Sequence, residues 1–218
     1  MKKTILFAIS ALLISMLIGC SSGCSSTTFY TYKRGEKPTH ISSAIIIPIW
    51  IDKDFSFRRV ESIKKAIAEW NNVLNGQIIL RQDGEFTGKE EALEHLEHAH
   101  KTHQGWVIIK FESDDPVLLK MVDDVDGKLA FVSNIGTGNL MVVINDNIGL
   151  LDLRTIVLHE IGHLLGAQHI NTNSLMAPEY KRGFNEVSCV DKITAAQVAS
   201  YNHLDLKTLN YCTIPNFE

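Results

Sequence analysis

Hydrophobic residues lie along the chain in two patterns, at helical spacing and in short continuous runs. Together they predict a domain in which helices cover a sheet. Residues 56–74 carry apolar side chains at helical spacing, with Gly76 just beyond them, so they predict an amphipathic helix. A second helix is predicted where an apolar stripe begins at Leu153 and continues through Leu165. Short runs rich in β-branched and aromatic residues predict strands at residues 44–51, 78–80, 106–111, 129–132 and 141–145.

The same pattern divides the chain into parts. Residues 20–42 are rich in small and polar residues without a sustained period, so we expect a flexible tether there and a folded domain over residues 43–218. Pro48 lies within the first predicted strand and cannot donate a backbone hydrogen bond, which favours an irregularity or an edge position. Residues 194–197, Thr-Ala-Ala-Gln, have the form of a capping box and predict a last helix that extends to about His203.

Residues 1–19 have the features of a signal peptide. Two lysines precede an apolar run over residues 5–18, which is shorter than the roughly 20 residues that span a bilayer. The run ends in Leu-Ile-Gly-Cys, which resembles the lipobox of bacterial lipoproteins and implies cleavage before Cys20 and lipidation of that cysteine. Ser21 comes next, which in such lipoproteins favours the outer membrane of a Gram-negative bacterium. The alternative is a plain secretory signal that leaves Cys20 as a thiol.

The candidate chemistry is concentrated in residues 159–169, His-Glu-Ile-Gly-His-Leu-Leu-Gly-Ala-Gln-His. On a helix, His159 and His163 lie one turn apart on one face, so both imidazoles can bind the same metal. Gly166 permits the left-handed conformation that ends a helix and lets the chain return His169 to that metal. Three neutral imidazoles with an open fourth position are typical of a catalytic zinc. The alternative is a cluster of structural histidines.

This motif is followed by residues 174–180, Ser-Leu-Met-Ala-Pro-Glu-Tyr, and the two together resemble the metzincin clan of zinc peptidases. The Leu-Met-x-Pro-x-Tyr segment is most similar to the matrixin branch of that clan. The resemblance implies an α+β catalytic domain with a twisted, mostly parallel sheet of about five strands and an antiparallel edge strand. An active-site helix and a C-terminal helix complete the expected fold.

The same resemblance assigns roles to individual residues. Glu160 is expected to act as the general base on a zinc-bound water and not as a ligand. Met176 would form the hydrophobic floor beneath the metal. Pro178 and Tyr180 would line the pocket for the side chain just after the scissile bond, and the edge strand would pair with the substrate.

The sequence also departs from the matrixin pattern. It has no Pro-Arg-Cys-Gly segment, and residues 20–42 are too short for a prodomain, so we expect no zymogen control of that kind. Cys24 is a candidate blocking thiolate, although an idle or redox-paired thiol in a linker is the favoured interpretation. The structural zinc ligand that follows Leu-Ala in matrixins is replaced by Phe131, so we expect no second zinc of that type.

Two polar segments are further candidates for metal binding. Asp123, Asp124 and Asp126 form an acidic turn whose hard oxygen ligands suit Ca²⁺, although such turns are also common without an ion. The segment 84–104 interleaves glutamates with four histidines, and a solvated charged helix is the favoured interpretation there. The alternative is that His95 and His98, which are three residues apart, share a metal; the other two histidines are His100 and His103.

Cysteine usage and charge narrow the remaining possibilities. Cys189 and Cys212 flank the predicted last helix and are candidates for a disulfide in an exported protein, with two reduced thiols as the alternative. The formal net charge of -4 and the lack of a basic stripe argue against a nucleic-acid partner. We expect a monomer that acts on peptide or protein substrates and is held to the membrane by its lipid. The competing hypothesis is a surface lipoprotein that binds metal or a surface without cleavage, but such a protein has no use for Glu160.

Overall fold

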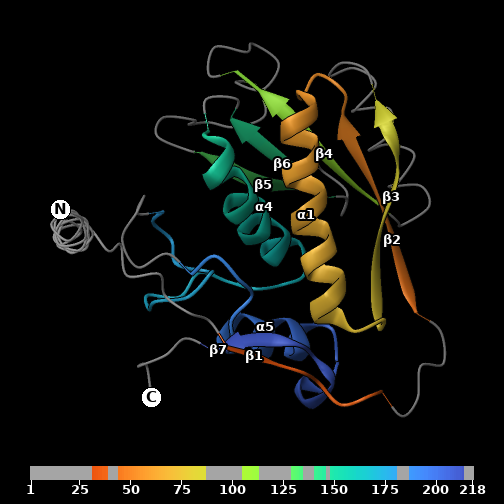
Figure 1. Ribbon diagram of the computed structural model, residues 1–218, viewed down its shortest axis with the longest axis vertical. Coiled ribbons are helices and arrows are strands. Elements are labelled where there is room, and N and C mark those ends of the chain that lie inside the picture. The colour runs from red at the N-terminus through yellow and green to blue at the C-terminus, as the bar shows by residue number, and fades with distance from the viewer. Residues whose placement is uncertain are drawn as a thin grey trace, which may run out of the picture.

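The computed structural model describes residues 31–38, 44–86, 105–112, 129–134, 140–145, 148–180 and 187–213. Within these residues, two long helices cover one face of a sheet, and a smaller C-terminal layer lies at one end of that assembly (Figure 1). Among the described helices, none combines the length and the apolar character needed to cross a membrane. The acidic turn at residues 123–126, the histidines of the segment 84–104, Cys20 and Cys24 lie outside the described residues.

The sheet has five strands in the order β3-β2-β4-β6-β5. All neighbouring pairs are parallel except β5 and β6, so β5 is the antiparallel edge strand that the resemblance implied. This arrangement confirms the expected fold class. The strands are β2 (Ile45–Asp52), β3 (Ile78–Phe86), β4 (Trp106–Phe111), β5 (Ala130–Asn134) and β6 (Leu140–Asn145).

Pro48 lies inside β2, which is an interior strand. Pairing of β2 with β4 begins only at Ile49, whereas Pro48 is already in register with Arg81 of β3. The part of β2 that contains the proline therefore has a single neighbouring strand, which a residue without a backbone donor tolerates. The register with β3 also shifts between Ile49 and Trp50, so the predicted irregularity is present.

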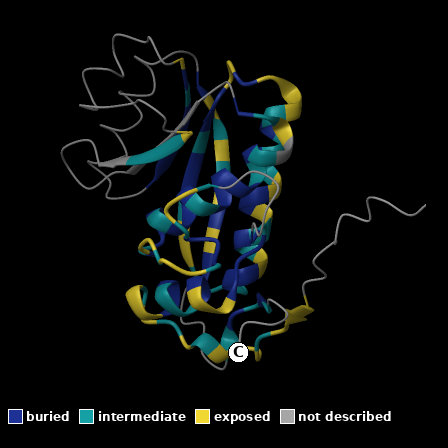
Figure 2. Ribbon diagram, turned by 90° about the vertical axis from the view of Figure 1, so that its left-hand side faces the viewer, coloured by how far each residue is buried: buried dark blue, intermediate teal, exposed yellow. Residues whose placement is uncertain are grey.

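Helices α1 (Phe57–Leu74) and α4 (Leu150–Leu164) pack side by side on the sheet (Figure 1). The indole Nε1 of Trp70 on α1 donates to the backbone oxygen of Leu158 at 3.0 Å, so the two helices are joined by a buried hydrogen bond. Figure 2 shows that α1 is buried on its inner side and exposed on its outer side. The apolar stripe of α4 predicted from the sequence lies entirely in this core, at Leu153, Val157, Ile161, Leu164 and Leu165.

The last helix, α5 (Lys192–Tyr201), begins three residues earlier than the capping box predicted. Its N-cap is Asp191, whose carboxylate accepts hydrogen bonds from the backbone N–H groups of Ile193 and Thr194. The predicted capping box is therefore wrong. Gln197 does not turn back to cap the helix, because its Oε1 accepts instead from the backbone N–H of Gln168 at 2.6 Å.

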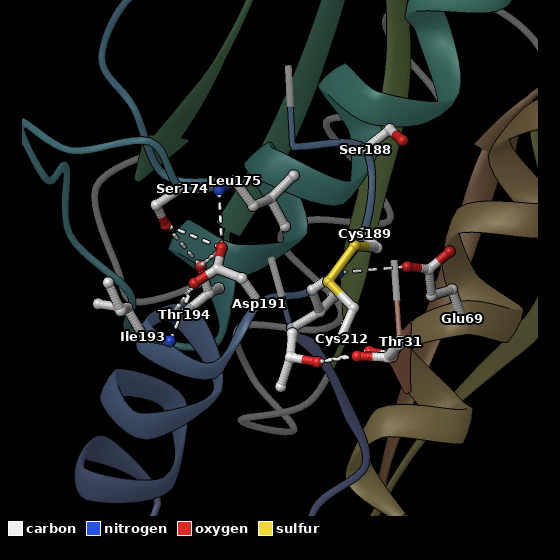
Figure 3. Close-up of a disulfide and its surroundings, with 12 residues drawn as sticks. Thr31, Glu69, Ser174, Leu175, Ser188, Cys189, Asp191, Ile193, Thr194 and Cys212 are labelled. Carbon is white, nitrogen blue, oxygen red and sulfur yellow. Dashed lines mark hydrogen bonds between the residues drawn. A yellow bond between two sulfur atoms is a disulfide. The ribbon is translucent and has the colours of Figure 1, made fainter. Parts of the chain in front are cut away.

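A small two-stranded sheet joins the chain's first and last described segments. Strand β1 (Thr31–Lys33), which falls within the range expected for the tether, pairs antiparallel with β7 (Tyr211–Thr213) after the 3-10 helix η1 (Leu206–Thr208). Gly35 extends this contact, since its backbone N–H donates to Asn210 Oδ1 at 2.7 Å. Cys189 and Cys212 form the predicted disulfide, which links β7 to the segment before α5 (Figure 3).

Candidate active site

The three histidines of the motif converge at the end of α4. His159 and His163 lie one turn apart on the helix, and Gly166, with φ +92°, turns the chain so that His169 comes back to them. The Nε2 atoms are separated by 3.1 Å (His159 to His163), 3.1 Å (His163 to His169) and 3.2 Å (His159 to His169). In the described part of the chain, these three residues form a group whose ligand atoms lie close enough together to hold one metal ion.

The hydrogen bonds of the rings decide what their Nε2 atoms can do. His159 Nδ1 lies 2.7 Å from the backbone oxygen of Leu175, and His163 Nδ1 lies 2.9 Å from that of Ala167. Because a carbonyl oxygen only accepts, each Nδ1 carries the proton and each Nε2 presents a lone pair. Lone pairs that converge this closely repel one another unless they share a cation. Tetrahedral zinc with bonds of 2.0–2.1 Å would place its nitrogens roughly 3.3 Å apart, so the observed triangle fits zinc.

Burial keeps these imidazoles in the form that binds metal. It lowers the pKa of His159 to about 4, and the neighbouring histidines add to that effect. The pKa of His163 is also lowered, again chiefly by burial. Both rings are therefore neutral at neutral pH, as a metal ligand must be.

Glu160 lies beside the triangle but is not part of it. Its side chain is only 6% exposed, and burial raises its pKa to about 8. Its Oε2 atom is buried and has no hydrogen-bond partner among the described residues. A buried carboxyl group with a vacant oxygen next to a metal site is suited to exchange a proton with a bound water.

Met176 packs against the helix that carries the first two histidines. It is completely buried, and its sulfur lies so close to Gly162 that a Cβ added there would be 2.6 Å from it. The glycine between the two helical histidines therefore makes room for the methionine against the helix backbone. The glycine of the motif is therefore the sequence signal of this contact, because a side chain at position 162 would displace Met176.

Asp191 is linked to the site by hydrogen bonds that the sequence did not reveal. Its Oδ2 atom accepts hydrogen bonds from Ser174 Oγ at 2.8 Å, Leu175 N at 2.8 Å and Thr194 Oγ1 at 2.9 Å (Figure 3). The backbone of Leu175 in turn holds His159 through its carbonyl oxygen. Asp191 therefore positions a candidate zinc ligand through one intervening residue.

The histidines and Glu160 open into a cleft of about 1540 Å³. On one side it is lined by Leu129 and by the first residues of β5, so the edge strand borders the cleft and can pair with an extended peptide. Pro178 and Tyr180 also line it. The predicted zinc ligands, base and pocket residues are thus brought together around a single cleft.

Two of three comparisons with known proteins found a match. Residues 52–198, more than half of the chain, match the family model of matrixin. A search of curated proteins gave no match. Among solved structures, the chain is similar to high choriolytic enzyme 1, a hatching enzyme zinc-protease from the medaka fish Oryzias latipes, with a TM-score of 0.35 and 17% identity over 62% of this chain. The match spans half the length of that structure. The chain therefore belongs to the matrixin family of zinc metallopeptidases.

Proposed function

We propose that this protein is a zinc-dependent endopeptidase that hydrolyses internal bonds of peptide or protein substrates. One observation carries the proposal: three imidazole Nε2 atoms within 3.2 Å of one another lie beside a buried carboxyl oxygen that has no partner among the described residues. This arrangement supplies both the ligands for a metal and a group that can move a proton. A protein that only binds metal needs the ligands and not the carboxyl group, so the geometry favours hydrolysis over metal storage or adhesion.

Zinc held by the three imidazoles would supply an acidic bound water and polarise the scissile carbonyl. The protein's own residues would move the proton and hold the histidine rings in place. Glu160 accepts the proton of the attacking water at Oε2 and delivers it to the leaving amine nitrogen. The backbone oxygens of Leu175 and Ala167 fix the ring orientations of His159 and His163 throughout.

The test is metal-dependent turnover. Full-length protein carrying one zinc per chain is expected to cleave an unfolded protein such as casein and members of a quenched peptide library. A chelator should abolish cleavage, and added zinc should restore it, because the three histidines leave the metal one open position for catalysis. Cleavage that persists after complete removal of metal would contradict the proposal. Stoichiometric zinc without cleavage across a broad library would support the binding-protein alternative.

We also propose that the enzyme is a lipoprotein of a bacterial outer membrane, anchored through Cys20. The support is the lipobox-like sequence at residues 17–20. Folded structure begins no later than Thr31, so an extended link would hold the domain within ~40 Å of the lipid. Cys20→Ser is expected to move the protein from the membrane fraction to the soluble fraction of cells. Unchanged membrane association of that variant would contradict the anchor.

A further inference from the structure

The three candidate zinc ligands are not held in the same way. His159 and His163 each have their Nδ1 atom fixed by a backbone oxygen, whereas the hydrogen bonds of His169 with the described residues all involve its Nε2 atom. His169 is also exposed and lies beyond α4, which ends at Leu164. Its position relative to the other two rings therefore depends on the backbone of the loop that carries it.

The backbone on both sides of His169 is held by hydrogen bonds. After it, the N–H of Ile170 donates to the backbone oxygen of Met176 at 2.9 Å. Before it, the N–H of Gln168 donates to Gln197 Oε1 at 2.6 Å. The first bond joins two backbone groups and needs no particular side chain. The second depends on the side-chain amide of Gln197, which is on α5.

Helix α5 contacts the same loop at two further points. Asn202, the C-cap of α5, donates from Nδ2 to the backbone oxygen of Leu165 at 2.8 Å. The ring of Tyr201 lies so close to Gly166 that a Cβ added to the glycine would overlap it. Tyr201 follows Gln197 by four residues, so the two side chains share one face of α5. The end of α5 therefore holds the chain along the whole turn between the second and third histidines.

The helix that makes these contacts is itself fixed in the core. Ala195, Val198 and Ala199 are buried on its inner side, and Asp191 caps its first turn. A loop that is bonded to such a helix inherits its position, whereas an exposed loop without such bonds would move relative to α4. The contacts with α5 thus link the loop of His169 to the core that carries His159 and His163.

We infer that Gln197 is a positioning residue of the metal site, which acts on His169 through the backbone N–H of Gln168. Loss of its acceptor would let the loop shift and move His169 Nε2 away from the two ligand atoms on α4. No bond at Nδ1 to the described residues would hold the ring against that shift, so metal affinity would fall. The inference rests on the zinc site of the proposed function but not on peptide hydrolysis.

Gln197→Met tests this role, because methionine has a similar length and flexibility but no oxygen that accepts from Gln168. The zinc dissociation constant of the full-length chain, measured by competition with a chelator, is expected to rise about 10-fold. Gln197→Glu is the conservative variant. Its carboxylate keeps an acceptor for the same N–H, so it should bind zinc at least as tightly as the wild type.

The visible absorption of bound Co²⁺ gives a second readout that a general loss of stability would not change. Co²⁺ absorbs more strongly in a tetrahedral site than in one where water has expanded its coordination, so the band reports on the ligand set. With Co²⁺ at saturation, Gln197→Met should show a weaker band than the wild type. Gln197→Glu should restore the band.

Gln77→Met is the matched control. Gln77 also joins two distant segments, because its Nε2 donates to Thr208 Oγ1 at 2.7 Å, but neither residue lines the cleft that holds the histidines. This variant loses a hydrogen bond of the same kind and should keep the zinc affinity and the Co²⁺ spectrum of the wild type.

Three outcomes would overturn the inference: wild-type zinc affinity in folded Gln197→Met, an equal loss of affinity in Gln77→Met, or a loss in Gln197→Glu as large as that in Gln197→Met. Failure of the proposed function is a separate result. If the zinc-loaded wild type cleaves no peptide, hydrolysis fails, but the affinities still decide the role of Gln197. A wild-type chain that binds no zinc would overturn both.

Discussion

Replacing Glu160 with alanine is expected to lower kcat/KM for peptide hydrolysis by about 10³-fold or more while zinc content stays at one per chain. The magnitude is that of general acid–base catalysis, here lost for both proton transfers at once. Zinc should remain because the ligand atoms that lie together in the described structure come from the three histidines and not from Glu160. Steady-state kinetics with a quenched peptide, paired with metal analysis of the same sample, check both parts.

Glu160→Gln makes the test sharper. It keeps the shape of the side chain and one acceptor oxygen, but an amide cannot accept a proton at neutral pH, so the loss should be similar to that of alanine. His163→Ala provides the contrasting case, since it should lose zinc and activity together. Activity above a tenth of the wild-type value in the zinc-loaded glutamine variant would rule out Glu160 as the base.

The metal-binding part of α4 could be predicted from the sequence because its chemistry depends on local geometry. A spacing of four residues on a helix fixes the relation of His159 to His163, and a glycine in the left-handed region fixes the return to His169. The apolar period of α1 and the β-branched runs of the sheet are local signals of the same kind. The disulfide was open to prediction because Cys189 and Cys212 are the two cysteines within the range expected to fold.

Features that depend on distant partners could not be predicted in the same way. Thr194 and Gln197 satisfy the pattern of a capping box, but the backbone N–H of Thr194, which Gln197 would bond in such a box, donates to Asp191. Gln197 instead finds a partner on the loop after α4. Strand β1 is three residues long, too short for a period, and its partner β7 lies at the other end of the chain. The role of Asp191 depends on the same kind of contact, because its donors come from two segments separated in the sequence.

Asp191→Ala is expected to lower the free energy of unfolding by about 4 kcal/mol and to weaken zinc binding by about 10- to 100-fold. The carboxylate is 2% exposed and accepts five hydrogen bonds, so its removal leaves several buried donors without partners. The effect on zinc has a separate cause. Leu175 would lose the bond to its N–H, and its carbonyl oxygen is the acceptor that orients the His159 ring.

Two further variants separate positioning of the zinc ligand from simple loss of stability. Asp205→Ala removes another aspartate that caps a helix, but at an exposed position, so it should cost about 1 kcal/mol and leave zinc affinity unchanged. Asp191→Asn keeps the volume of the side chain but replaces one carboxylate oxygen with an amide nitrogen. That nitrogen is a donor, so it cannot accept the hydrogen bonds that the oxygen accepts from N–H and O–H groups. Competition with a chelator, measured where each variant is fully folded, gives the zinc affinity. If folded Asp191→Asn binds zinc with wild-type affinity, Asp191 stabilises the fold without positioning His159. If Asp191→Asn binds zinc more weakly and Asp205→Ala does not, the Asp191 carboxylate controls the metal site through Leu175.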